Sequence, residues 1–104
     1  MLAHNVFFTL KDPAPGAIAS LLADCKSDLA KDPGVVSFHC GVREPELSRP
    51  VNVLDFQVGV HIVFKDRAAH DAYQLSPAHK RFIEANKDNW EQSRVFDTIV
   101  EPPE

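Results

Sequence analysis

The order of hydrophobic patterns along the chain constrains its fold more than any other feature. Residues 3–10 alternate between two sets of side chains with a period of two, which is typical of a β-strand. Residues 15–29 place apolar side chains three and four positions apart and so predict an amphipathic helix, with Pro15 at its first position. The elements expected after this helix are strands at residues 35–44 and 55–65, helical segments at 66–75 and 77–90, and a last strand at 94–101.

This β-α-β-β-α-β order is the pattern of the split βαβ, or ferredoxin-like, fold. It predicts an α+β protein in which a four-stranded antiparallel sheet carries both helical regions on one face. The length of 104 residues suits a single domain, which is expected to span residues 1–104. The apolar side chains of the third strand that are expected to share one face are Phe56, Val58, Val60, Ile62 and Phe64.

The opposite face of the predicted sheet is also partly apolar. A face open to water is expected to be more uniformly polar, and the two helical regions cover one face only. We therefore expect a homodimer in which two copies pack sheet to sheet as an α/β barrel, rather than a monomer with one half-wet face. The apolar residues expected on this second face are Phe7, Val35, Val63, Phe96 and Val100, and the polar ones are Asn5, Thr9, His39, Gln57 and His61.

Composition and charge disfavour several classes of partner. The net charge of −4 argues against nucleic acid and anionic membranes, and no apolar run approaches the ~20 residues that span a bilayer. The first residues lack the features of a signal peptide, so we expect the chain to start at its mature N-terminus. The two cysteines, Cys25 and Cys40, form neither a disulfide framework nor a metal-binding pair. We therefore expect a cytoplasmic protein, and the absence of any cofactor fingerprint predicts that it uses no cofactor.

Four segments carry a resemblance over nearly the whole chain: AHNVFFTLKD, GVVSFHCG, HIVFKDRAAHDAYQLSPAHKRFIE and VFDTIV. They resemble the stress-responsive A/B barrel family, also described as dimeric α/β barrels. The resemblance implies the same fold and the same homodimer as the residue patterns, and a place among stress-response proteins. It implies little about a reaction, because fold alone is a weak guide to function.

The C-terminal half is also similar to a plant polyketide cyclase of this kind. In that comparison His79 falls at the position of the catalytic base, Tyr73 at that of a catalytic tyrosine, and His4 at a further pocket histidine. Two positions depart from the cyclase: Val58 stands in place of a histidine, and residues 24–26 lack the tyrosine of its first helix. The matching residues are Tyr73, Pro77, Ala78, His79, Phe82, Trp90, Phe96 and Asp97.

The start of the last helical segment gives His79 a defined environment. Ser76 is expected to cap this helix and Pro77 to occupy its first position, as Asp66 is expected to cap the helix before it. The helix dipole then disfavours an imidazolium at His79, so a neutral ring is expected. A neutral His79 can remove a proton next to a carbonyl group that Tyr73 polarises. The alternative is structural: the two side chains bond each other, or His79 closes the helix start.

One apolar pocket is expected between the helices and the sheet. Its polar points would be His4, Tyr73 and His79, and a flat or oily carbonyl compound would suit it. The alternative for His4 is a hydrogen-bonded residue of the core. The expected walls are Phe8, Val58, Val60, Phe82 and Trp90.

The remaining polar candidates are expected to be structural. His39 and His61 are expected to form hydrogen bonds in the dimer interface, and no metal is expected at them or elsewhere. His70 is expected to lie in solvent. The expected partners of the Asp97 carboxylate are Arg94 and Lys65.

Three functions remain open on these grounds. The first is a small dimeric protein that binds a hydrophobic or aromatic carbonyl metabolite without chemistry of its own. The second is a cofactor-free cyclase, isomerase or monooxygenase-like enzyme with His79 as base and Tyr73 as carbonyl polariser. The third is a structural dimer whose interior is filled by its own side chains.

Overall fold

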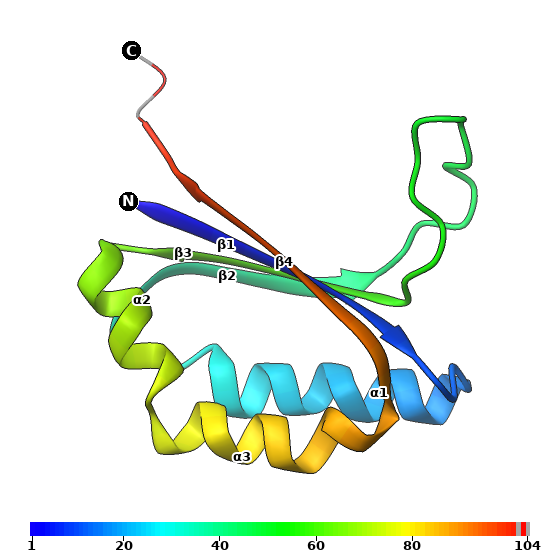
Figure 1. Ribbon diagram of the computed structural model, residues 1–104, viewed down its shortest axis with the longest axis horizontal. Coiled ribbons are helices and arrows are strands. Elements are labelled where there is room, and N and C mark those ends of the chain that lie inside the picture. The colour runs from blue at the N-terminus through cyan, green and yellow to red at the C-terminus, as the bar shows by residue number, and fades with distance from the viewer. Residues whose placement is uncertain (102, 104) are drawn as a thin grey trace.

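The structure is a computed structural model that describes residues 1–101 and 103, with the elements in the predicted order (Figure 1). Residues 102 and 104 of the expected domain lie outside the described residues. A π-helical turn, Cys25–Leu29, continues the first helix, and a 3-10 turn, Lys87–Asn89, follows the last one. The helices and strands are β1 (Leu2–Leu10), α1 (Pro15–Asp24), β2 (Val35–Val42), β3 (Val58–Phe64), α2 (Arg67–Gln74), α3 (Pro77–Asn86) and β4 (Trp90–Ile99).

The four strands form one antiparallel sheet in the order β2-β3-β1-β4, and the three helices lie on one side of it (Figure 1). This confirms the predicted α+β, ferredoxin-like architecture. The two central strands carry the core: every second side chain from Leu2 to Leu10 is buried, and so are Val58, Val60, Ile62 and Phe64 in β3. His4 is the one polar member of the buried row in β1.

Side-chain caps determine where α2 and α3 begin. The backbone N–H of Ala69 donates to Oδ1 of Asp66 at 2.8 Å, and that of His79 donates to Oγ of Ser76 at 3.1 Å. Each bond satisfies a donor that the first helical turn leaves unpaired. Both predicted caps are therefore confirmed, and the second one places His79 in the first turn of α3.

A β-bulge in β2 changes the face on which Val35 lies. The pairing register with β3 shifts between Val35 and Ser37, so Val36 is an extra residue in this strand. Val35 consequently packs against the core on the helix-covered face, together with Phe38 and Cys40. The prediction that Val35 belongs to the opposite face is wrong, because strict alternation takes no account of an inserted residue.

Two aromatic residues near strand ends also differ from the prediction. Phe56 precedes β3, and its ring packs against Phe7 on the face away from the helices, with centroids 5.0 Å apart. The period of two holds only inside the strand, so it misplaces Phe56. Trp90 begins β4 instead of continuing a helix, because α3 ends at Asn86. Its ring still reaches the core, where its centroid lies 4.7 Å from that of Phe8.

The face of the sheet away from the helices is called the open face, because no helix of the described residues covers it. Phe7 lies at its centre and also contacts Phe96, with ring centroids 5.9 Å apart. Phe96 is only partly covered by other residues, since 56% of its surface is exposed to solvent. The loop between β2 and β3 projects to the same side of the sheet (Figure 1). Its exposed apolar residues are Leu47, Val51, Val53 and Leu54.

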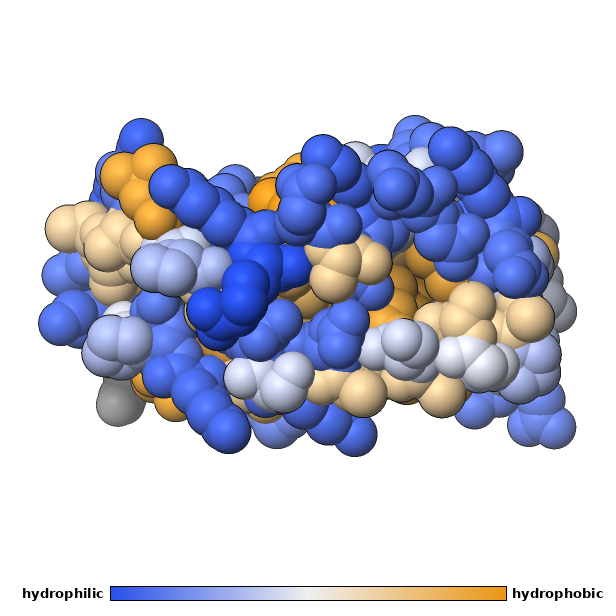
Figure 2. Space-filling model, turned by 90° about the horizontal axis from the view of Figure 1, so that it is seen from below, coloured by the Kyte–Doolittle hydropathy of each residue, from blue (hydrophilic) through white to orange (hydrophobic). Residues whose placement is uncertain are grey.

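The helix-bearing side presents a different surface. Seen from that side, it is largely hydrophilic, with apolar atoms visible in hollows between the polar side chains (Figure 2). This is the pattern of amphipathic helices that bury one stripe against a sheet. Within the described part of the chain, no helix has the length and apolar character needed to cross a membrane.

Candidate functional site

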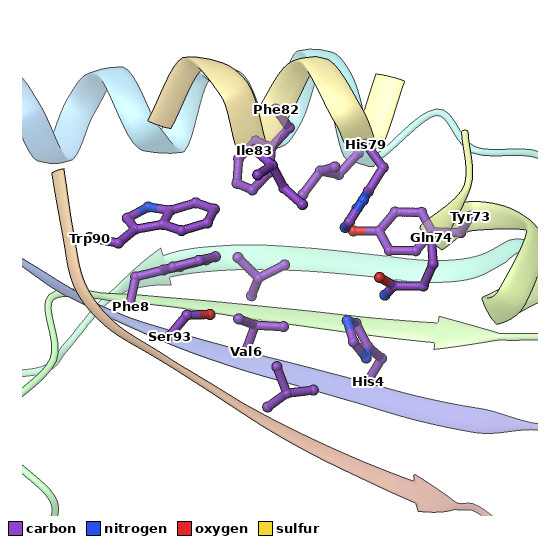
Figure 3. A pocket seen from close by; sticks show the side chains of 13 residues that line it. His4, Val6, Phe8, Tyr73, Gln74, His79, Phe82, Ile83, Trp90 and Ser93 are labelled. Atoms are coloured by element: carbon purple, nitrogen blue, oxygen red, sulfur yellow. The ribbon is translucent and has the colours of Figure 1, made fainter. Parts of the chain in front are cut away.

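A cavity of about 170 Å³ lies between the sheet and α3 (Figure 3). Its floor is the helix-facing side of the sheet, and its roof comes from α3, the end of α2 and the π-helical turn. The lining residues Ser93 and Val95 are exposed on the edge strand β4, so the cavity opens to solvent along this edge. The lining consists of His4, Val6, Phe8, Leu29, Val60, Tyr73, Gln74, His79, Phe82, Ile83, Trp90, Ser93 and Val95.

His79 enters this cavity from the first turn of α3. Its imidazole meets the ring of Tyr73 edge to face, with centroids 4.7 Å apart, and its Nδ1 atom is buried without a hydrogen-bond partner among the described residues. Burial lowers the pKa of His79, and nearby His4 and His70 lower it further, whereas the backbone carbonyl of Gln74 opposes the shift. The lowered pKa favours a neutral ring at neutral pH, and burial is the main cause of this shift.

Tyr73 supplies a proton donor to the same space. Its side chain is almost wholly buried. Burial raises the pKa of Tyr73, and the neighbouring Cys25 and Asp32 raise it further. The phenol therefore keeps its proton over the physiological pH range, and Figure 3 shows its hydroxyl directed toward the ring of His79.

His4 and Asp97 face each other across the pairing of β1 with β4. Nδ1 of the buried imidazole lies 2.5 Å from Oδ1 of the carboxylate. The prediction that Asp97 pairs with Arg94 or Lys65 is wrong, because the partner of its carboxylate is His4. Arg94 projects to the other face of β4 and donates to Asp55 at 2.6 Å.

His70 is a functional candidate that the sequence analysis missed, since it was expected in solvent. Its side chain is 16% exposed, and its ring centroid lies 5.1 Å from that of His4. Nδ1 of His70 lies 2.9 Å from Oδ1 of Asp71. The signal that places it inward is its spacing: His70 precedes Tyr73 by three positions, which puts both on one side of α2.

The structure brings most of the sequence-predicted site residues together. His4, Tyr73 and His79 all line the cavity, and so do four of the five predicted wall residues. Val58 is fully buried and lies outside the lining. The four predicted wall residues in the lining are Phe8, Val60, Phe82 and Trp90. Two further polar residues of the lining had no signal in the sequence, because Gln74 lies at the end of a helix and Ser93 on an edge strand.

The fold and the cavity define a small α+β protein of ferredoxin-like topology with an apolar site beneath its helices. The sequence profile of the stress responsive A/B barrel domain family matches residues 2–100. The chain belongs to this family, which confirms the resemblance seen in the sequence. A comparison with proteins of curated function gives no match.

Solved structures from several organisms have the same fold. A Dabb family protein with a ferredoxin-like fold from Mesorhizobium loti is 27% identical, covers 97% of each chain and has a TM-score of 0.78. A dimeric ferredoxin-like protein of unknown function from Thermobifida fusca is 15% identical over 95% of this chain and 90% of that chain, with a TM-score of 0.80. A hydroxynitrile lyase from Passiflora edulis is 19% identical over 96% of this chain and 93% of that chain, with a TM-score of 0.79.

Proposed function

We propose that the protein binds a small, uncharged, flat carbonyl compound in the cavity. The observation that carries this proposal is an unpaired polar atom in an apolar site. Nδ1 of His79 is buried and has no partner in the described part of the chain, and the hydroxyl of Tyr73 is directed toward the same imidazole ring (Figure 3). An unpaired buried polar atom costs about 1–3 kcal/mol, and the carbonyl oxygen of a ligand recovers this cost when Nδ1 carries the ring proton and donates to it.

The volume of the cavity limits the ligand to about one ring. The value of about 170 Å³ is close to that of an engineered apolar cavity, about 150 Å³, that holds benzene. A larger compound would extend through the opening beside Ser93 and Val95. The class that fits is therefore an aromatic or cyclic aldehyde or ketone, with any substituent directed toward the edge of β4.

The charges around the cavity favour a neutral ligand. His79 and Tyr73 are uncharged at neutral pH, and the carboxylate of Asp97 lies next to His4 at one end of the site. A carboxylate ligand would lose its hydration here without gaining a cation as partner. We therefore expect ketones to bind and acids of the same shape not to bind.

Tryptophan fluorescence tests the proposal directly. The chain contains a single tryptophan, Trp90, and its side chain lines the cavity. Titration with acetophenone should change the emission along a saturable curve, whereas benzoate, which has a similar shape and a charge, should not. Free N-acetyltryptophanamide serves as the control for collisional quenching.

Two variants connect the signal to the site. His79→Leu and Tyr73→Phe each remove one hydrogen-bonding group and should weaken acetophenone binding by about tenfold, which corresponds to 1.4 kcal/mol. The matched control is His39→Leu on the open face, where binding should be unchanged. Absence of saturable binding by any one-ring ketone, or equal affinity in all three variants, contradicts the proposal.

A second candidate is cofactor-free proton abstraction, and the lowered pKa of His79 is the observation that favours it. The neutral imidazole would take a proton from the carbon next to the ligand carbonyl, while the hydroxyl of Tyr73 donates to the oxygen that becomes the enolate. The same first step serves a cyclase, an isomerase or a monooxygenase-like reaction. The family fold also carries an enzyme, the hydroxynitrile lyase of Passiflora edulis.

Hydrogen exchange separates this enzyme from a plain binding protein. In deuterated water, the methyl protons of bound acetophenone should exchange faster with the parent protein than with the His79→Leu variant, as followed by NMR. Saturable binding without accelerated exchange would support a binding protein without a reaction of its own and would exclude His79 as a base. Accelerated exchange that survives in His79→Leu would assign the base elsewhere.

We also infer that the working unit is a homodimer formed through the open face. An apolar recess supports this inference. It has a volume of about 230 Å³ and lies on this face between Phe7, Phe56 and Phe96, and the projecting loop adds Val53 to its wall. The loop reaches to the side where a second copy would stand. The Thermobifida fusca protein of this fold is described as dimeric.

A further inference from the structure

We propose that His4, His70 and Asp97 form a binding site for a divalent transition-metal ion. The three residues, here called the three-residue cluster, come from β1, α2 and β4 and lie close together. Figure 1 shows α2 near the end of the sheet where β1 begins and β4 ends. Each offers one ligand atom, and these atoms all lie within 4.8 Å of one another. The site is additional to the proposed ligand pocket, with which it shares His4.

The ligand set has a recognisable chemistry. Two imidazole nitrogens and one carboxylate oxygen suit borderline divalent ions such as Zn²⁺, Fe²⁺ and Co²⁺. Mg²⁺ and Ca²⁺ prefer oxygen ligands and do not suit it. Three protein ligands also leave one or more positions of the ion free for water, and the side chain of Asp97, which is 42% exposed, lies on the solvent side of the cluster.

The distances between the ligand atoms of the cluster range from below to above those found around a bound metal ion. Metal–ligand bonds of about 2.0–2.1 Å place the ligand atoms roughly 3.0–3.5 Å from one another. The His4 and Asp97 atoms now lie 2.5 Å apart and would move apart slightly, whereas the widest pair would close from no more than 4.8 Å. His70 can make this adjustment by a small rotation of its side chain, since the position of α2 itself is fixed by its buried residues Ala69 and Tyr73.

A chain of hydrogen bonds already orients His70 for this role. Its Nδ1 atom faces the carboxylate of Asp71 at 2.9 Å, and Arg67 holds the same carboxylate at 2.8 Å. With Nδ1 engaged in this way, Nε2 is the nitrogen left to bind a metal. A histidine ligand that gives its other nitrogen to a carboxylate is a recurring arrangement in metal proteins, where it fixes the ring and raises its basicity.

The burial of the cluster distinguishes it from a chance surface group. His4 is almost completely buried, and the His70 ring packs edge to face on it with an interplanar angle of 63°. The rings of Phe64 and Tyr73 surround the two histidines, with centroids 6.0 Å from that of His4. The apolar surroundings exclude competing water on the protein side and leave the exposed side at Asp97 as the entry path.

Calorimetric titration of the chelator-treated, full-length protein with Zn²⁺ tests the proposal. We expect one ion per chain, and we expect Co²⁺ to bind at the same site with a visible absorption band. Mg²⁺ and Ca²⁺ should give no heat of binding at this site. Thermal unfolding should shift to higher temperature in the presence of Zn²⁺, because the ion binds the folded chain.

Variants at His70 and Asp97, the two less buried members of the cluster, leave the buried His4 in place. His70→Ala and Asp97→Asn should each remove a ligand and weaken Zn²⁺ binding by more than about 100-fold, whereas Asp71→Asn should weaken it by about 10–100-fold. The matched controls are His39→Ala and His61→Ala on the open face, with affinity unchanged. Circular dichroism checks that each variant is folded.

Two results would overturn the proposal. One is the absence of stoichiometric Zn²⁺ binding at micromolar protein concentration. The other is binding that persists in His70→Ala and Asp97→Asn but disappears in a control variant, which would assign the ion to the open face. Neither result depends on whether the cavity binds a ketone, because the metal titrations and the Trp90 fluorescence titrations are read out separately.

Discussion

Gly34 passes so close to Ala69 that no side chain fits between them. A Cβ atom added to Gly34 would lie 2.7 Å from Cβ of Ala69 and 3.4 Å from its Cα. The chain entering β2 therefore packs directly on the first turn of α2, and Lys65 N–H donates to the Gly34 carbonyl at 3.2 Å. This contact sets the position of the helix that carries His70 and Tyr73.

Gly34→Ala should therefore destabilise the protein by about 1–3 kcal/mol, since the added methyl group overpacks the contact and displaces α2. Urea denaturation measures the change in the free energy of unfolding. The double variant Gly34→Ala/Ala69→Gly removes the clash and should recover part of the loss, despite a cost of about 1 kcal/mol for glycine in a helix. Strictly additive effects of the two substitutions would show that the contact does not hold α2.

Ser76→Ala should lower the free energy of unfolding by about 1 kcal/mol, because it removes the oxygen that accepts the N–H of His79. The same hydroxyl donates to the carbonyl of Tyr73 at 2.9 Å, so the two site residues lose a shared partner. Chemical denaturation measures the loss. Ser27→Ala is the matched control, since that hydroxyl makes one long bond of 3.4 Å to Asp24. Equal losses in both variants would rule out a special role for the cap.

His79 should make stability depend on pH. Burial lowers the pKa of His79 below 6.5, its ordinary value, so the unfolded chain binds more protons than the folded chain between the two values. The free energy of unfolding should therefore fall as the pH drops through about 6.5, and this residue should contribute no slope well above it. Denaturation curves of the parent and of His79→Leu between about pH 5 and pH 8 measure the difference. Parallel pH profiles of the two proteins would refute this.

Phe96→Glu should separate the proposed homodimer into single chains. A charge at this position would be buried unpaired against the second copy, which is costly. Light scattering should report twice the chain mass of 11.6 kDa for the parent and a single chain for the variant. Leu75→Glu is the matched control, because Leu75 is also exposed but lies between α2 and α3, away from the open face. A well-folded, single-chain parent at micromolar concentration would contradict the homodimer.

Local sequence determined the elements and their buried faces. The alternation of β1 and the helical spacing after Pro15 depend only on chain geometry, because a strand repeats every two residues and a helix every 3.6. The caps at Asp66 and Ser76 are equally local, since each bonds a backbone donor three residues away. These features, together with the order of the elements, were enough to predict the ferredoxin-like sheet.

Residue patterns failed where the chain leaves regular structure. The inserted residue in β2 moved Val35 to the core, and the start of β3 left Phe56 on the open face. Neither a bulge nor the exact first residue of a strand changes the composition of the segment. Both are settled by pairing with a neighbouring strand that is distant in the sequence.

The residues of the candidate site also fall into those that the sequence predicted and those that only the tertiary structure brought together. The sequence by itself determined that His79 lies in the first turn of a capped helix, and the family resemblance singled it out with Tyr73 and His4. Only the tertiary structure decided that Asp97 meets His4 instead of Arg94, and that His70 turns toward both. The reason is that these residues lie 93 and 66 positions from His4 along the chain, so their contact depends on how β1, α2 and β4 pack, which no local pattern records.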